Sequence, residues 1–179
     1  MNKQTLRSIR KQAQQGFTLI ELIVVIVILG ILAATALPKF ADLSGNARIA
    51  ALNAAAGALR STVATVHGQA LLSPGTSPLV VEGVNVTITN GYPDFGANTA
   101  TAAGLLPTDW IIVPAGTAAN GGSGGQNVAV GASSFVVIPA SLSGSTRATT
   151  CYVTYTGSSV SNGVVTPPSV TVNGSATTC

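Results

Sequence analysis

The stretch that decides the fold begins Gly16-Phe17-Thr18-Leu19-Ile20-Glu21 and then stays uncharged from Leu22 to Leu37, where Pro38 follows. At about 1.5 Å per helical residue, Phe17 to Leu37 covers roughly 31 Å, which is close to the hydrocarbon thickness of a bilayer. Glu21 is the one carboxylate in this run. Because a charged group is costly in hydrocarbon, its presence there indicates a function.

The residues before Phe17 form a short basic leader, whose charged residues are Lys3, Arg7, Arg10 and Lys11. By the positive-inside rule, this end is expected to stay in the cytoplasm while the remainder of the protein crosses the membrane. An ordinary secretory signal peptide is the alternative, since Ala34-Thr35-Ala36 fits a small-residue cleavage pattern. The length of the apolar run and the carboxylate within it argue against a signal peptide.

The leader ending in Gly16, followed by Phe17, Glu21, Gly30 and Pro38 at these spacings, resembles the type IV prepilins with a short leader. The resemblance implies cleavage between Gly16 and Phe17 by a prepilin peptidase and methylation of the new Phe17 amine. It also implies that the pilus assembly machinery of the inner membrane builds the mature subunit into a helical homo-oligomeric filament.

A carboxylate among packed apolar helices needs a positive partner or must be neutralised. The free amine created at Phe17 is the nearest candidate, and the resemblance implies that Glu21 pairs with this amine in an adjacent subunit and sets the register. Pro38 lacks a helix donor, so a kink is expected there. The same resemblance implies that the segment from Gly30 to Pro38 can unwind.

Beyond Pro38 the sequence predicts a second, amphipathic helical segment over 39–72. Apolar residues recur there at alternating spacings of four and three, which marks one helix face. They are Leu52, Ala56, Leu59, Val63, Val66 and Ala70.

From Ser73 onward the pattern changes to short strands separated by turn residues. Val84 to Thr89 alternates apolar and polar residues before Asn90-Gly91. Further strand candidates are 110–113, 134–138, 152–156 and 169–172. The predicted class is therefore α+β, the pilin fold, with a long N-terminal helix packed against a C-terminal antiparallel sheet. The expected parts are a cleaved leader (1–16), a membrane and filament-core helix (17–38), the amphipathic helix (39–72) and a sheet region (73–179).

Cys151 and Cys179 are the only cysteines, and export would place them in an oxidising compartment. One disulfide is the simplest expectation; it would close a loop of about 29 residues and contribute on the order of 3 to 4 kcal/mol. Metal ligation is the weaker alternative because two thiols and one distant histidine do not make a zinc set, so no metal or cofactor is expected. The pair resembles the C-terminal disulfide region of type IV pilins.

Charge and motifs argue against nucleic-acid binding and catalysis. The whole chain has a net charge of +3, but from Phe17 onward four basic residues face five acidic ones, a formal charge of −1. Without a basic cluster, no nucleic-acid partner is expected. His67 has no carboxylate or cysteine at helical spacing, so a packing role is expected. Asp94 and Asp109 could form a carboxylate pair, but turn or N-cap roles are commoner.

Looser similarities extend along the sequence. Pro38-Lys39-Phe40, Gly91-Tyr92-Pro93, Asp109-Trp110 and Cys151-Tyr152-Val153-Thr154-Tyr155 most resemble the mannose-sensitive haemagglutinin pilins. This resemblance implies attachment to surfaces and names no ligand site. The expected location is the bacterial inner membrane, with the C-terminal domain in the periplasm, and then an extracellular pilus. The alternatives are a pseudopilin of a type II secretion system and a secreted binding domain released after Ala36.

Overall fold

The computed structural model describes residues 17–114, 118–120 and 127–179, without the side chains of 37–42, 118–120, 127 and 129. The expected leader, 1–16, lies outside these residues. The chain forms two compact units, Met1–Phe40 and Ala41–Cys179. Helix α1 (Leu19–Leu72) contributes to both.

The first unit is helical and apolar. Its segment Leu19–Ala36 has a mean hydropathy of 2.8 and is long enough to cross a membrane. None of this segment is buried within the single chain. Exposed apolar surface of this extent indicates contact with lipid or with other protein. Leu43–Leu72 is also long and apolar enough to cross a membrane, but a third of it is buried, as in the core helix of a globular unit.

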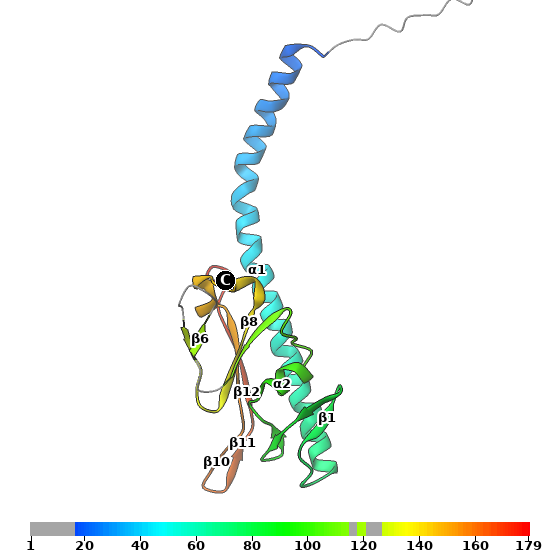
Figure 1. Ribbon diagram of the computed structural model, residues 1–179. Helices are drawn as coiled ribbons and strands as arrows, with labels where there is room; N and C mark the ends of the chain where they lie inside the picture. The colour runs from blue at the N-terminus through cyan, green and yellow to red at the C-terminus, as the bar shows by residue number, and fades with distance from the viewer. Residues whose placement is uncertain (1–16, 115–117, 121–126) are drawn as a thin grey trace, which may run out of the picture. The chain divides into compact units, whose positions relative to one another are not determined.

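In the second unit, α1 packs its apolar face against a sheet (Figure 1). The helix side chains that recur at spacings of four and three are all buried or half-buried. Leu52, Ala56 and Leu59 lie in one cluster with Phe135 and Tyr155 of the sheet. Val66 belongs to a second, smaller cluster with Val81, Val86 and Ala102. The α+β arrangement expected from the sequence is therefore confirmed.

The main sheet has four antiparallel strands in the order β12-β9-β8-β5. Their bounds are Trp110–Val113 for β5, Ser134–Pro139 for β8, Tyr152–Thr156 for β9 and Ser169–Asn173 for β12. These strands confirm the four further strand candidates of the sequence, 110–113, 134–138, 152–156 and 169–172. Every residue of β8 is buried, whereas β9 alternates half-buried and buried positions, as expected for a strand with one face on the core.

The remaining elements are short. Four two-stranded pairs form: β1 (Leu79–Val81) with β2 (Val84–Val86), β3 (Ile88–Thr89) with β4 (Tyr92–Pro93), β6 (Ala118–Asn120) with β7 (Asn127–Ala129), and β10 (Ser159–Ser161) with β11 (Val164–Thr166). Helix α2 covers Ala97–Ala102, and 3₁₀ turns cover Ala140–Leu142 and Thr146–Thr149.

The alternating run from Val84 to Thr89 differs from the single strand that its pattern suggests. Its first half pairs with β1 and its second half with β4, so the chain changes partner at Thr87. The Thr87 carbonyl accepts a hydrogen bond from the Asp94 nitrogen at 2.9 Å. Alternation reports which residues face inward, but it does not report which neighbour a strand pairs with.

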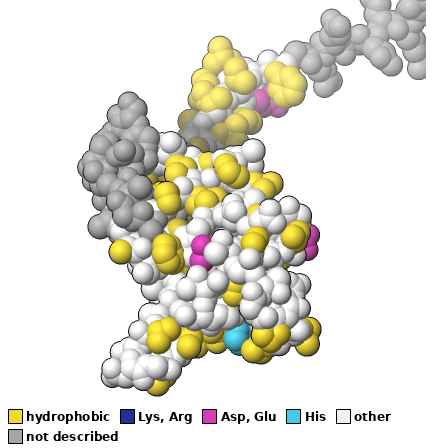
Figure 2. Space-filling model, turned by 60° about the horizontal axis from the view of Figure 1, so that its bottom comes forward, with side chains coloured by type: hydrophobic (Ala, Val, Ile, Leu, Met, Phe, Trp, Pro, Cys, Tyr) yellow, Lys and Arg dark blue, Asp and Glu magenta, His cyan; other side chains and the backbone are white. Residues whose placement is uncertain are grey.

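Few charged side chains mark the surface of the second unit. Residues 41–179 contain three arginines, no lysine and four acidic residues. On the face drawn in Figure 2, apolar side chains are scattered and few charged side chains are seen among the other side chains and the backbone. Such a surface offers hydroxyls and amides for contact rather than a charged patch.

Candidate functional site

Glu21 lies at the start of α1 and shares three hydrogen bonds with Thr18, two donated by Thr18 and one donated by Glu21. The Thr18 nitrogen donates to Glu21 Oε2 at 2.9 Å, and the Thr18 hydroxyl donates to the same oxygen at 2.7 Å. The Glu21 nitrogen donates back to Thr18 Oγ1 at 3.3 Å. This is the capping box, in which residues three apart satisfy each other's free helix-end groups. The Thr-x-x-Glu spacing was visible in the sequence, but the local role of Thr18 was missed.

The capping box changes the expectation for Glu21 before assembly. The carboxylate does not require an immediate cationic partner, because two donors of Thr18 already reach one of its oxygens. Glu21 nevertheless remains exposed and borders a shallow hollow with Phe17, Ile20, Val24 and Val25. Phe17 itself is 93% exposed. Apolar side chains therefore surround a carboxylate that a second molecule can reach.

Gly16, Gly30 and Pro38 are the other predicted site positions near the amino terminus. Gly16 lies outside the described residues, so the Gly16-Phe17 junction has no structural account. Helix α1 runs through Gly30 and Pro38 without a break in its helical assignment. A Cβ added at Gly30 would meet no atom within 4 Å. Packing within the single chain does not require this glycine, and the unwinding of 30–38 stays a prediction.

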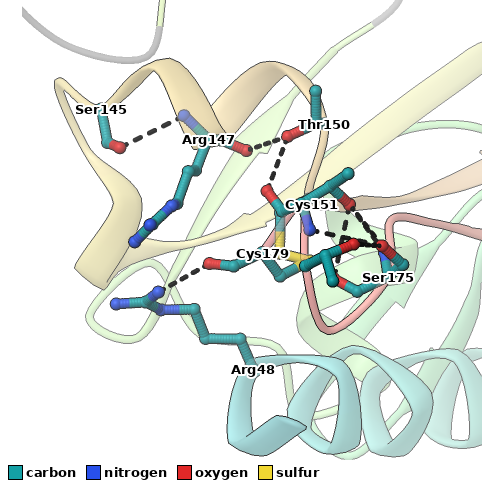
Figure 3. The surroundings of a disulfide bond; sticks show 9 residues. Arg48, Ser145, Arg147, Thr150, Cys151, Ser175 and Cys179 are labelled. Carbon is teal, nitrogen blue, oxygen red and sulfur yellow. Dashed lines mark hydrogen bonds between the residues drawn. A yellow bond between two sulfur atoms is a disulfide. The ribbon is translucent and has the colours of Figure 1, made fainter. Parts of the chain in front are cut away.

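The disulfide expected from the two cysteines is present. Cys151 and Cys179 are joined, with their Cα atoms 5.1 Å apart, and both residues are buried (Figure 3). The Arg48 side chain, which comes from α1, donates to the Cys179 carbonyl oxygen at 2.6 Å. Thr150 adds a bond from its hydroxyl to the Thr178 carbonyl at 3.0 Å. The C-terminal segment is thus held to the residues before β9 by the disulfide and the Thr150 bond, and to α1 by the Arg48 bond.

Gly45 marks a close approach between α1 and the same segment. A Cβ at this buried position would overlap the backbone carbonyl of Ala176. Sequence reasoning missed this contact because the two residues lie far apart in the sequence. The absence of a side chain at Gly45 allows the C-terminal segment to lie against the helix.

The polar residues that were considered for catalysis have structural partners. His67 Nδ1 lies 2.7 Å from the Gly91 carbonyl oxygen, and its ring stacks on Tyr92 with centroids 4.0 Å apart. Asp94 Oδ1 accepts a hydrogen bond from the Gly96 nitrogen at 3.0 Å in the turn before α2. Asp109 contributes its backbone carbonyl, which accepts from the Ala140 nitrogen at 2.9 Å. No metal-binding group of three His, Cys, Asp or Glu occurs among the described residues.

The amino-terminal region matches a known motif. Residues 11–37 fit the family model described as the prokaryotic N-terminal methylation motif. The match contains the expected Gly16-Phe17 junction and Glu21, and it ends just before Pro38.

Curated relatives are named for pili or fimbriae. Over 56 residues the chain is 54% identical to the type IV narrow pilus major component PilA5 of Thermus thermophilus, covering 31% of this chain and 48% of that protein. It is 36% identical over 97 residues to a fimbrial protein of Moraxella nonliquefaciens, covering 52% of this chain and 62% of that protein. FimA, a type IV major fimbrial protein of Dichelobacter nodosus, is 38% identical over 55 residues, 31% of this chain and 35% of FimA.

The chain spans about half the length of the first of these relatives and somewhat more of the second. None of the three names denotes an enzyme. No solved structure matches the chain significantly.

The chain is thus similar to prepilins in its N-terminal methylation motif, which an apolar helix continues and an antiparallel sheet region follows. Within that class, the motif and the named relatives support a type IV pilin.

Proposed function

We propose that this chain is a structural subunit of a type IV pilus. Its mature form begins at an N-methylated Phe17. The α1 helices of many copies pack together in the core of a surface filament. The observation that carries the proposal is the N-terminal methylation motif over 11–37, together with the exposure of the apolar helix segment Leu19–Ala36 in the single chain. Such a surface needs a lipid or protein environment. The membrane supplies lipid before assembly, and neighbouring subunits supply protein contacts in the filament.

The subunit is proposed to pass from the inner membrane to the surface filament. Before assembly the segment 17–38 anchors the subunit in the inner membrane, with the leader in the cytoplasm and residues 41–179 in the periplasm. The basic leader and the positive-inside rule support this orientation. The partners are a prepilin peptidase that also methylates, the assembly machinery of the inner membrane, and further copies of the same subunit.

In the proposed assembly step, the Glu21 carboxylate exchanges its Thr18 donors for the Phe17 amine of an adjacent subunit. The apolar hollow around Glu21 favours this exchange, because an ion pair gains strength where water is excluded. Gly30 and Pro38 would supply a segment that unwinds as the fibre forms. Attachment to surfaces is the proposed role of the finished pilus, since residues 41–179 carry few charges and are rich in serine, threonine and asparagine.

The charge of Glu21 can be separated from its capping role by two substitutions. Glu21→Gln keeps an acceptor suited to a capping box but removes the charge, whereas Thr18→Ala removes the cap and leaves the carboxylate. We expect Glu21→Gln, like the harsher Glu21→Val, to be processed at Gly16-Phe17 but to yield few or no filaments. Thr18→Ala is expected to retain filaments. The readouts are the intact mass of the processed subunit and the amount of filament sheared from cells.

The matched control is Glu82→Gln, which makes the same chemical change at an exposed turn of the second unit. Filament yield from this variant should equal that of the unaltered protein. Normal filament yield from Glu21→Gln and Glu21→Val would contradict the assembly role given to the carboxylate.

A further inference from the structure

Three Asn-Gly pairs lie within the described residues: Asn90-Gly91, Asn162-Gly163 and Asn173-Gly174. In such a pair, glycine leaves its backbone nitrogen unhindered for attack on the asparagine side chain. Closing that ring requires the backbone and side chain of the asparagine to rotate. The rate of ring closure at each asparagine therefore depends on how freely its backbone and side chain can move. The contacts around each asparagine determine that freedom.

Asn162 is the unrestrained member of the three. It occupies the turn between β10 and β11 with φ of 51°, followed by Gly163 with φ of 78°. All residues from Ser159 to Thr166 are exposed. The two strands pair with each other beyond Thr156 and Ser169, where the β9–β12 pair ends, so the turn lies at the exposed tip of a long hairpin (Figure 1). Among the described residues, no side chain forms a hydrogen bond with the Asn162 amide.

Asn90 has nearly the same turn conformation but is held in place. Its φ is 55° and that of Gly91 is 80°. Its Nδ2 donates to Ser158 Oγ at 3.3 Å, and the same Ser158 hydroxyl donates to the Thr89 carbonyl at 3.0 Å. The Gly91 carbonyl is 2.7 Å from His67 Nδ1. Opening this turn would break all of these contacts.

Asn173 is held by the main sheet. Its backbone pairs with Tyr152, and its Nδ2 donates to Thr154 Oγ1 at 3.1 Å. Gly174 lies so close to its surroundings that an added Cβ would stand 2.7 Å from both the Thr150 carbonyl and Cys179 Sγ. The segment that follows is fixed by the disulfide.

We propose that Asn162 is a site of spontaneous, age-dependent deamidation in the folded protein, and that Asn90 and Asn173 are protected. The Gly163 nitrogen attacks Cγ of Asn162 and forms a new C–N bond. The bond between Cγ and Nδ2 breaks at the same carbon, and the amide nitrogen leaves as ammonia, the Gly163 N–H giving up its proton to balance the one that the leaving group gains. Water then opens the resulting succinimide at either carbonyl. The net change is uptake of one water and loss of one ammonia, and the product is aspartate or isoaspartate.

The modification would alter the hairpin in two ways. It places a carboxylate, ionised at neutral pH, in a hairpin that has no charged residue between Ser158 and Pro168. That charge would stand beside Val160 and Val164, whose side chains are 53% and 67% exposed. Isoaspartate also lengthens the backbone by one carbon, which disrupts the two-residue turn. Older molecules would therefore present a more acidic and less ordered hairpin, whether or not the protein builds pili.

The test incubates the full-length protein in detergent at mildly alkaline pH and follows deamidation at each asparagine by peptide mass spectrometry with fragmentation that identifies isoaspartate. Asn162 is expected to convert several-fold faster than Asn90 and Asn173 in the folded protein. In a parallel sample unfolded in denaturant, the three rates are expected to converge, because the sequence pair is the same.

Ser158→Ala supplies a matched variant, since it removes the partner of the Asn90 amide without touching the β10–β11 turn. It should raise the rate at Asn90 and leave the rate at Asn162 unchanged. Asn162→Gln should abolish deamidation in the peptide that contains the β10–β11 turn, whereas the same peptide of the unaltered protein deamidates with time. The proposal is overturned if Asn162 in the folded protein reacts no faster than Asn90, or if its rate rises on unfolding as much as theirs.

Discussion

At the scale of single residues, Tyr155 joins the core to the turn before α2. Its hydroxyl donates to the Pro93 carbonyl at 2.6 Å, and its ring stacks on Phe135 with centroids 4.8 Å apart. Burial, with a smaller contribution from the nearby Asp94 carboxylate, raises the pKa of Tyr155 well above its ordinary value. The neutral phenol is therefore the form that the folded protein holds.

This raised pKa predicts how stability depends on alkaline pH. In the unfolded protein tyrosine loses its proton near pH 10, while Tyr155 in the folded protein keeps it. The unfolded state then binds fewer protons, so the free energy of unfolding falls as pH rises above about 10. Denaturant titrations at a series of pH values measure this slope.

Tyr155→Phe isolates the contribution of this one group. The variant should lose about 1 to 3 kcal/mol at neutral pH, because the buried Pro93 carbonyl is left without its donor. Its stability should then fall less steeply above pH 10 than that of the unaltered protein. Equal slopes in the two proteins would show that Tyr155 is not the source of the pH dependence.

At the scale of elements, the sequence predicted which residues face the core and where the main strands lie. The inward face of α1 in the second unit follows from the spacing of its apolar residues, because burial imposes that spacing. The four main-sheet strands follow from short apolar or alternating runs between turn residues. The partner switch at Thr87, the contact of Gly45 with Ala176 and the hairpin partners were not predictable. They depend on which distant segments meet, and a local pattern does not contain that information. The Thr18 cap, by contrast, was missed although the Thr-x-x-Glu spacing could have predicted it.

Glycines of α1 provide a prediction at this scale. Glycine weakens a helix interior, so Gly57→Ala, where an added Cβ would meet nothing within 4 Å, should raise the free energy of unfolding by about 1 kcal/mol. Gly45→Ala should instead lower it by about 1 to 3 kcal/mol, because the new methyl would overlap the Ala176 carbonyl. Thermal unfolding of the two variants side by side is the measurement. Stabilisation by both would show that the C-terminal segment does not pack against Gly45.

At the scale of the whole molecule, the second unit depends on its covalent link. Replacing both cysteines, Cys151→Ser with Cys179→Ser, removes a crosslink over a sequence separation of 28 residues. The expected cost is on the order of 3 to 4 kcal/mol by the loop-entropy relation. We expect a lower Tm and a lower pilus yield. Unchanged values of both would contradict a structural role for the disulfide.

The central claim is that this protein is cleaved before Phe17, methylated and assembled into a filament on the cell surface. Intact-mass measurement of sheared surface material, beside membrane and culture-supernatant fractions, tests it most directly. The account predicts that a species beginning at methylated Phe17 dominates the sheared fraction. The same species confined to membranes would indicate a pseudopilin instead, and a soluble product beginning at Leu37 would contradict the account altogether.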